Sequence, residues 1–189
     1  MKICVFAGSS IGKEPIYARA AQDLGAVLAS ADIGLVYGGA KIGLMGQVDD
    51  AVLRHGGTVI GVIPQVIAQV EVAHEGLTEL HVVPDMHSRK ATMADLSDAF
   101  VALPGGIGSL EELFEVWTWT QLGIHTKPLG ILNVNNFYSG LLAFLDHVRD
   151  EGFLKPGHRD LLQSCDSPQT LIDRLANLPM DTSSVQSKL

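Results

Sequence analysis

The stretch "AFVALPGGIGSLEELFEVW", residues 99–117, carries the pattern that decides the fold. It begins with an apolar run, continues through three closely spaced glycines, and ends in apolar residues at helical spacing (Leu110, Leu113, Phe114 and Trp117). An uninterrupted apolar run is typical of a strand that is buried on both faces, as in a parallel sheet. The stretch therefore predicts a strand that passes through a glycine loop into a helix over residues 109–121.

The same strand and helix unit recurs along the chain. Further strands are expected at residues 2–8, 34–39, 58–64, 79–84, 128–134 and 160–167. Helices are expected from Pro15 onward and at about 44–55, 86–98, 137–149 and 167–177, with Ser167 capping the last. This alternation favours a single-domain, Rossmann-like α/β fold, a doubly wound parallel sheet flanked by helices. The domain is expected to span residues 1–179, followed by a polar, disordered tail at 180–189.

Composition and charge narrow the classes of function. The chain has 189 residues, of which 47% are hydrophobic and 18% are charged, and a formal charge of −8. Such a charge argues against nucleic acid and against anionic membranes as partners. No apolar run is long enough to span a bilayer, and the start is too short for a signal peptide. The two cysteines, Cys4 and Cys165, lack a redox or metal spacing, so we expect reduced, buried thiols in a cytoplasmic protein.

Three glycines precede the predicted helix at 109–121, and they suggest a site for an anion. In doubly wound sheets ligands bind outside the carboxyl ends of the strands, where Gly105, Gly106 and Gly108 lie. Glycine lets a ligand approach the backbone, and the free N–H groups of a helix start attract phosphate. The hydroxyl of Ser109 could add a donor. The alternative is a tight turn without a ligand. A dinucleotide fingerprint does not fit, because its third glycine is missing and the loop follows the fifth strand.

Three glutamates follow the loop. Glu111 and Glu115 are four residues apart and share a helix face, which can be a solvated or an interfacial surface. Glu112 is turned about 100° from Glu111 and lies within one turn of the loop. A carboxylate beside a bound sugar can stabilise the oxocarbenium-like state through which glycosidic bonds break.

A second polar cluster, "DMHSRK", follows the predicted strand at 79–84. Met86 and Arg89 are three residues apart and share a helix face, whereas His87 and Lys90 share another. The guanidinium of Arg89 can hold phosphate or sugar oxygens in a fork. The cluster can equally be a cap or a surface salt bridge, and His87 fits a structural role. No Cys and His spacing supports a metal site.

These two segments together resemble a known family. "PGGIGSLEE" is similar to the PGGxGTxxE signature, and "MHSRK" to the MHxRK element, of the LOG ("Lonely Guy") proteins, which are cytokinin riboside 5′-monophosphate phosphoribohydrolases. "VFAGSS" and "YGGAKIGLMG" extend the resemblance over most of residues 1–150. The resemblance implies hydrolysis of N6-modified purine riboside 5′-monophosphates, or of AMP, to free base and ribose 5-phosphate, without a cofactor or a metal.

The resemblance also implies roles for individual residues. Arg89 and Glu112 would be catalytic. The remaining implied substrate-binding positions are Ser10, Gly38, Gly39, Met86, Lys90, Gly105, Gly106, Ile107, Gly108 and Ser109, where Ser109 replaces the family's threonine. Members are dimers or higher assemblies, and residues off the apolar stripe (Glu115, Trp119) are candidates for that contact.

Three alternative functions remain to be weighed at the level of sequence. The family is also labelled a possible lysine decarboxylase. Pyridoxal phosphate needs a lysine for the Schiff base and an acidic partner for the pyridine nitrogen. Nothing in the sequence marks Lys41 or Lys90 as a desolvated lysine, and no acidic partner is evident. A nucleotide carrier or sensor would use the same loop without turnover. A ribosyl transferase or phosphorylase would need an acceptor base or inorganic phosphate.

Overall fold

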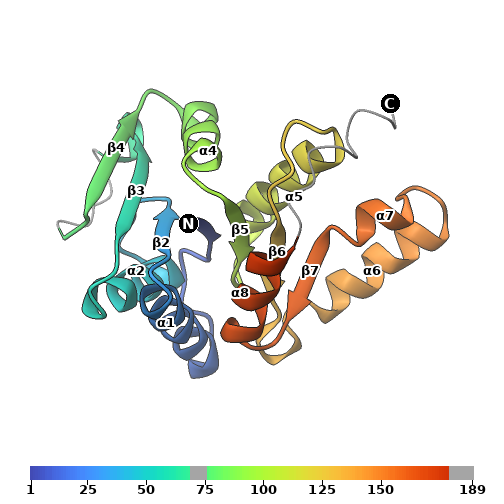
Figure 1. Ribbon diagram of the computed structural model, residues 1–189, viewed down its shortest axis with the longest axis horizontal. Coiled ribbons are helices and arrows are strands. Elements are labelled where there is room, and N and C mark those ends of the chain that lie inside the picture. Colours follow the sequence, from blue (N-terminus) through green and yellow to red (C-terminus); the bar gives the residue numbers. More distant parts are fainter. Residues whose placement is uncertain (69–75, 179–189) are drawn as a thin grey trace.

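The computed structural model describes residues 1–68 and 76–178, which form one seven-stranded sheet with helices on both faces (Figure 1). The strands are β1 (Lys2–Phe6), β2 (Gly34–Tyr37), β3 (Val59–Pro64), β4 (Glu79–Val83), β5 (Ala99–Ala102), β6 (Leu129–Leu132) and β7 (Leu162–Cys165). Every pairing is parallel. The expected α/β fold and all seven expected strands are confirmed.

The strand order β4-β3-β2-β1-β5-β6-β7 contains one reversal of direction. The chain first builds outward from β1 to β4 and then returns to place β5 on the other side of β1. The loops that leave β1 and β5 consequently run to different sides, and the switch point between their carboxyl ends is the candidate crevice, where ligands bind in such sheets. The connection from β4 to β5 must cross β3, β2 and β1, and it contains helix α4 (Met86–Asp95).

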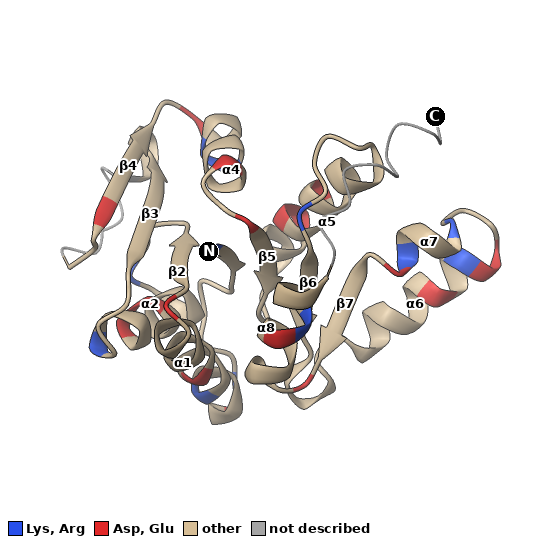
Figure 2. Cartoon of the chain, in the orientation of Figure 1, with Lys and Arg blue, Asp and Glu red and all other residues tan. Residues whose placement is uncertain are grey.

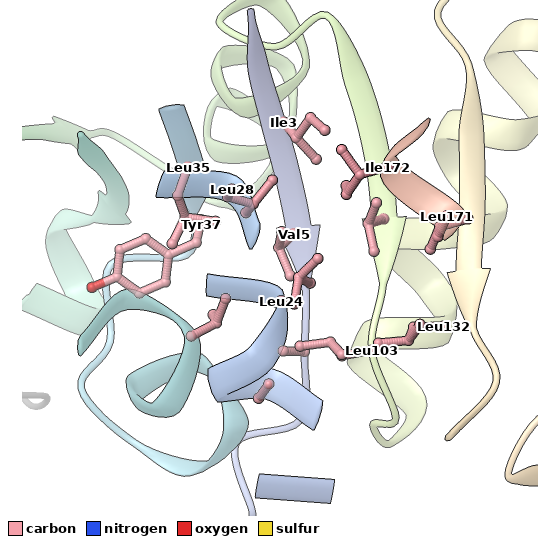
Figure 3. Packing of buried hydrophobic residues seen from close by; sticks show 14 of the residues in the cluster. Ile3, Val5, Leu24, Leu28, Leu35, Tyr37, Leu103, Leu132, Leu171 and Ile172 are labelled. Carbon is pink, nitrogen blue, oxygen red and sulfur yellow. The ribbon is translucent and has the colours of Figure 1, made fainter. Parts of the chain in front are cut away.

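The helices cover the sheet in two layers, each over its own apolar core. They are α1 (Pro15–Ser30), α2 (Gly43–Arg54), α3 (Gln65–Ala68), α4, α5 (Ile107–Gln121), α6 (Ser139–Asp150), α7 (Pro156–Arg159) and α8 (Pro168–Asn177), with a 3-10 turn at Val134–Asn136. α1, α2 and α8 pack on one face, where Ile3 and Val5 of β1 point; Figure 3 shows Leu24 and Leu28 of α1 beside them. α4, α5 and α6 pack on the other face, against Cys4 and Phe6. This alternation is the period of two expected of strands buried on both sides.

The structure corrects several local expectations. α5 begins at Ile107, two residues before the expected start, so Ile107 and Gly108 belong to its first turn. α4 ends at Asp95, earlier than expected, because its last turn gives way to a loop at Ser97. Ser167 occupies the N-cap position of α8, but its side chain makes no capping hydrogen bond. The predicted tail at 180–189 lies outside the described residues.

Both cysteines are free and buried, as expected. In the two described ranges, no helix combines the length and the apolarity that crossing a membrane requires.

Candidate active site

Backbone hydrogen bonds join the loops around the candidate crevice at the ends of β1 and β5. The N–H of Gly8, after β1, donates to the carbonyl of Pro104, after β5, at 3.1 Å. The carbonyl of Gly8 accepts from the N–H of Leu44 in α2 at 2.9 Å. A Cβ on Gly8 would lie 3.2 Å from both Gly105 Cα and Pro104 O, so the two loops approach as closely as glycine allows. Gly8 lies in the "VFAGSS" segment at the end of the first strand, and the sequence alone assigns it no role of its own.

The N-terminus of α5 opens onto this crevice. Gly106 is its N-cap, and the first helical hydrogen bond runs from the N–H of Leu110 to the carbonyl of Gly106 at 3.2 Å. The N–H groups of Ile107, Gly108 and Ser109 therefore precede the intrahelical ladder. Nothing lies within 4 Å of a Cβ built on Gly106 or Gly108. These two glycines are thus not required by packing, and they leave open space at a helix start that favours an anion.

Gly105 and Ser109 serve the loop itself. A Cβ on Gly105 would lie 2.1 Å from Ser109 Oγ and 3.0 Å from the backbone nitrogen of Gly8. Ser109 is only 5% exposed, so its hydroxyl is packed beneath Gly105 rather than presented on the surface. Because the loop backbone folds over this hydroxyl, a small residue is needed at Gly105. The sequence alone did not separate this packing glycine from the two open ones.

Arg89 reaches the crevice from the distant strand β4 by way of α4. Asp85 caps the helix by accepting from the N–H of Ser88 at 2.7 Å, which fixes the first turn. Because α4 crosses over β3, Arg89 Nε donates to the carbonyl of Val62 at 3.2 Å, and Nη2 donates to the carbonyl of Gly38 at 3.4 Å. Met86 lies beside it, with its sulfur 3.9 Å from Arg89 Nη1. The predicted common face of Met86 and Arg89 is therefore confirmed.

The two glycines after β2 are buried, and each has a structural reason. A Cβ on Gly38 would lie 1.9 Å from Arg89 Nη2, so the absence of a side chain makes the space that the guanidinium occupies. Gly39 has a φ of +79°, which L residues rarely adopt. Ser10, on the loop after β1, is exposed at the same edge of the sheet. Of these three expected residues, Ser10 is thus the one exposed to solvent.

Glu112 projects from α5 toward Arg89. Its Oε1 lies 3.9 Å from Arg89 Nη1, and the two side chains are only 14% and 12% exposed. Burial raises the pKa of Glu112 above its ordinary value, while the charge of Arg89 opposes that rise. The expected convergence of these two distant segments is present in the structure. The two opposite charges are mostly buried and face each other at a distance longer than a hydrogen bond.

Lys90, next in sequence to Arg89, binds the other two glutamates of α5. Its Nζ lies 2.6 Å from Glu111 Oε1 and 3.0 Å from Glu115 Oε2. Burial alone would lower the pKa of Lys90, but the hydrogen bonds to Glu111 and Glu115 outweigh it and raise the pKa. Figure 2 shows acidic positions on α5 and basic positions on α4. A Schiff-base lysine for pyridoxal phosphate needs the opposite, a readily neutralised amine, so Lys90 does not fit that cofactor.

The two residues considered for a subunit contact are already engaged within the chain. Glu115 is bound to Lys90 and its side chain is 24% exposed. Trp119 is half-buried and meets His125 edge-on at a ring distance of 6.4 Å. Within residues 1–68 and 76–178, no three side chains of His, Cys, Asp or Glu are grouped so that they could hold a metal ion.

Comparison with known proteins gives the chain its relatives. The family model described as "Possible lysine decarboxylase" matches residues 45–175. The cytokinin riboside 5′-monophosphate phosphoribohydrolase LOG3 of Arabidopsis thaliana is 52% identical over 174 residues, which cover 92% of this chain and 81% of that protein. The probable cytokinin riboside 5′-monophosphate phosphoribohydrolase LOGL2 of Oryza sativa subsp. japonica is 49% identical, with coverage of 100% and 77%.

Solved structures agree on the fold at much lower identity. The molybdenum cofactor carrier protein of Chlamydomonas reinhardtii superposes with a TM-score of 0.71 at 19% identity, over 94% of this chain and 98% of that one. The structural genomics target TM1055 gives 0.69 at 20% identity, over 94% and 99%. At such identities the likeness shows the fold alone. The family match and the relatives at about half identity, together with the signature segments around Arg89 and Glu112, establish that the chain belongs to the LOG family.

Proposed function

We propose that this protein hydrolyses the N-glycosidic bond of purine riboside 5′-monophosphates that carry an N6 substituent, and releases the free base and ribose 5-phosphate. The observation that carries the proposal is the mostly buried pair of Arg89 and Glu112, 3.9 Å apart, at the end of the sheet where α5 presents its free N–H groups. The names of the relatives, which are cytokinin riboside 5′-monophosphate phosphoribohydrolases, support the same reaction.

The start of α5 binds the 5′-phosphate in this proposal. The open space at Gly106 and Gly108 lets phosphate oxygens approach the backbone, with Ile107 and Ser109 supplying the neighbouring N–H groups and Gly105 shaping the loop. Ser10 adds a hydroxyl from the facing loop, while Gly38 and Gly39 shape the floor beneath Arg89. Phosphate binding at this point holds the ribose in place, and that binding energy lowers the entropic cost of reaching the transition state.

The carboxylate of Glu112 stabilises the reacting sugar. As the bond from C1′ to the purine nitrogen breaks, its electron pair leaves with the base, and positive charge develops on the ribosyl ring. An ionised Glu112 attracts that charge strongly because its site is mostly buried, and it can accept a proton from the attacking water. Water supplies hydroxide to C1′ and a proton to the departing base, so atoms and charge balance.

Arg89 orients the substrate rather than donating a proton. A guanidinium stays charged at neutral pH and is a poor proton donor. Its Nε and Nη2 are bound to backbone carbonyls, which leaves Nη1 on the side of Glu112 and Met86. A fixed Nη1 can hold a sugar hydroxyl or an oxygen of the substrate in line with the carboxylate.

Apolar side chains at this edge of the sheet favour a base with an apolar substituent. Each of the first five strands is followed by a connection or helix start that carries one exposed apolar residue: Ile11, Ile42, Val66, Met86 and Ile107 are between 42% and 83% exposed. These residues supply apolar area at the edge of the sheet where the proposed site lies. An N6-prenylated AMP would use it, whereas AMP itself would not.

Product analysis tests the proposal. The protein is incubated with isopentenyl-AMP and with AMP, and base and ribose 5-phosphate are separated and quantified. We expect equimolar release of both products, faster from isopentenyl-AMP. Binding without turnover would instead identify a carrier or sensor. A strict need for inorganic phosphate or an acceptor base would identify a phosphorylase or a transferase.

Assembly and location complete the proposal. Exposed apolar residues after α5 (Leu122 at 55% and Ile124 at 65%) support association of two copies into a homodimer, which light scattering would detect as twice the chain mass. The two free thiols support a cytoplasmic location.

A further inference from the structure

We propose that Lys90 is a positioning residue, which keeps Glu112 ionised and aligned by neutralising Glu111 and Glu115, and that it does not contact the substrate. The inference rests on the proposed function for its catalytic consequence, although its effect on Glu112 is measurable without turnover. It gives Lys90 a different role from that of the substrate-binding residue that the family resemblance implies.

Contact geometry supports this role. Lys90 Nζ lies within 3.0 Å of a carboxylate oxygen of both Glu111 and Glu115, and the side chain is only 12% exposed. The ammonium group donates a hydrogen bond to Glu111 Oε1 and forms an ion pair with Glu115 Oε2. The clamp joins α4 to α5 directly beside Arg89 and Glu112, so the reactive pair and the clamp are set by the same two helices.

Charge supplies the reason for such a clamp. The residues at this contact between α4 and α5 are Arg89, Lys90, Glu111, Glu112 and Glu115, which sum to one net negative charge. Without Lys90 the sum would be two negative charges beside a helix start that should bind phosphate. Uncompensated carboxylates at such short range would also favour protonation of their neighbour Glu112. Lys90 thus resolves the conflict between a run of glutamates and an anion site in one segment.

Among residues 1–68 and 76–178, the charged groups found to act on Glu112 are Arg89, Lys90, Glu111 and Glu115. Arg89 and Lys90 lower the pKa of Glu112, whereas Glu111 and Glu115 raise it in addition to burial. Cys4 of β1 also faces Glu112, but burial raises the pKa of its thiol well above the ordinary value, so the thiol is neutral. Removal of Lys90 should therefore raise the pKa of Glu112, whereas removal of Glu111 and Glu115 should lower it.

Direct titration of Glu112 tests the inference. The side-chain carboxyl carbon of Glu112 is followed by ¹³C NMR from pH 3 to 9 and is assigned by its absence in Glu112→Gln. We expect the titration midpoint to move upward in Lys90→Met and downward in Glu111→Gln/Glu115→Gln, a pair of changes that leaves Lys90 in place. Lys155→Met, which removes an exposed lysine on the other half of the sheet, is the matched control and leaves the midpoint unchanged.

Activity gives the second readout. In Lys90→Met, kcat/KM for isopentenyl-AMP should fall between about 10- and 100-fold, as expected for a displaced catalytic group, and the acid limb of its pH profile should move upward. Lys90→Arg should keep the acid limb of the parent. The triple variant Lys90→Met/Glu111→Gln/Glu115→Gln should recover kcat/KM to within about fivefold, because the charges that Lys90 neutralises are gone.

Two results would overturn the inference. An unchanged Glu112 midpoint in both Lys90→Met and Glu111→Gln/Glu115→Gln would show that the clamp does not act on Glu112. A triple variant that stays as impaired as Lys90→Met, with a raised KM, would show that Lys90 contacts the nucleotide. If the parent protein releases no base, the proposed function fails, whereas the NMR titration still decides whether Lys90 controls Glu112.

Discussion

Of the three ion pairs that join α4 to α5, the pair of Arg89 and Glu112 differs in geometry from the two that Lys90 makes. Arg89 and Glu112 face each other at 3.9 Å, beyond hydrogen-bond distance. Lys90 and Glu111, one position away on each helix, are in direct contact at 2.6 Å. Arg89 is held instead by the backbone carbonyls of Val62 and Gly38, so its position does not depend on Glu112.

The difference separates groups that hold the structure from groups that are available for chemistry. In a pair in direct contact, each charge is neutralised by its partner. In a pair held apart by other hydrogen bonds, both charges remain available to interact with a ligand. Because one turn of α5 carries both kinds, the run of glutamates that seems unfavourable beside an anion site divides into a clamp and one reactive carboxylate. The predictions below test that division.

Replacing Glu112 should have the largest effect. Glu112→Gln keeps the shape of the side chain but removes the charge that stabilises the ribosyl cation, so kcat should fall by about 10²–10⁴-fold. Steady-state release of base from isopentenyl-AMP measures this. Glu151→Gln, an equal change of charge on an exposed residue after α6, is the control and should retain parental rates. Parental rates in Glu112→Gln would assign the chemistry elsewhere.

Crowding the anchor of Arg89 should have the next largest effect. In Gly38→Ala the new methyl carbon would lie 1.9 Å from Arg89 Nη2 and displace the guanidinium. We expect kcat/KM to fall by about 10- to 100-fold, as for other small displacements of catalytic groups.

A double-mutant cycle isolates this contact. Denaturant unfolding should show that Gly38→Ala destabilises the parent protein but not the Arg89→Ala variant, in which the space is free. Equal destabilisation in both backgrounds would mean that Gly38 is needed for some other reason.

Filling the open start of α5 should affect binding more than folding. A Cβ on Gly108 meets nothing within 4 Å, so Gly108→Ala should leave the free energy of unfolding unchanged or raise it by up to about 1 kcal/mol, the gain of alanine over glycine in a helix. The methyl group would nevertheless obstruct phosphate, and KM should rise about tenfold. Gly140→Ala, at the second position of α6 with equally open space, is the matched control. Equal KM values in the two variants would place the phosphate elsewhere.

The loop after α5 should have the smallest effect on activity, because His125 acts on stability in acid. Burial, with a further contribution from Lys127, lowers the pKa of His125 from 6.5 to about 4. The unfolded chain therefore takes up a proton first, and the stability due to neutral His125 is complete above pH 6.5 and lost as pH falls toward 4. The slope from this group is at most about 1.4 kcal/mol per pH unit.

Chemical unfolding at a series of pH values in the parent and in His125→Gln measures that slope. We expect a flatter dependence between pH 6.5 and 4 in the variant. This separates acid unfolding from protonation of Glu112, because the acid limb of activity should remain in His125→Gln. Identical slopes would show that His125 does not titrate in this range.

Much of the fold could be predicted, because strands buried on both faces are written as apolar runs. All seven strands and the opening of α1 at Pro15 follow from local patterns. α5 begins at Ile107, two residues before the predicted start, because glycine is a weak helix former and Gly108 disfavoured a helix prediction at this point. The predicted capping hydrogen bond of Ser167 is absent, because a serine at the N-cap position favours capping but does not fix the direction of its side chain.

The site could be predicted only in part, because some of its contacts join distant segments. The motifs identify Arg89 and Glu112 as candidates, and the fold places their side chains 3.9 Å apart. The reason for Gly38 is a guanidinium 51 residues away, and no local pattern could show it. The partners of Lys90 were likewise hidden, although the spacing of Glu111 and Glu115 on one helix face was a usable signal.

A crystal structure of Glu112→Gln with isopentenyl-AMP tests the central claim most directly, since the substituted enzyme should bind the nucleotide without cleaving it. The account predicts the 5′-phosphate on the backbone N–H groups at Gly106 and Gly108, and C1′ of the ribose between residue 112 and Arg89. A nucleotide bound with its phosphate on another helix, or with its ribose away from residue 112, would contradict the account.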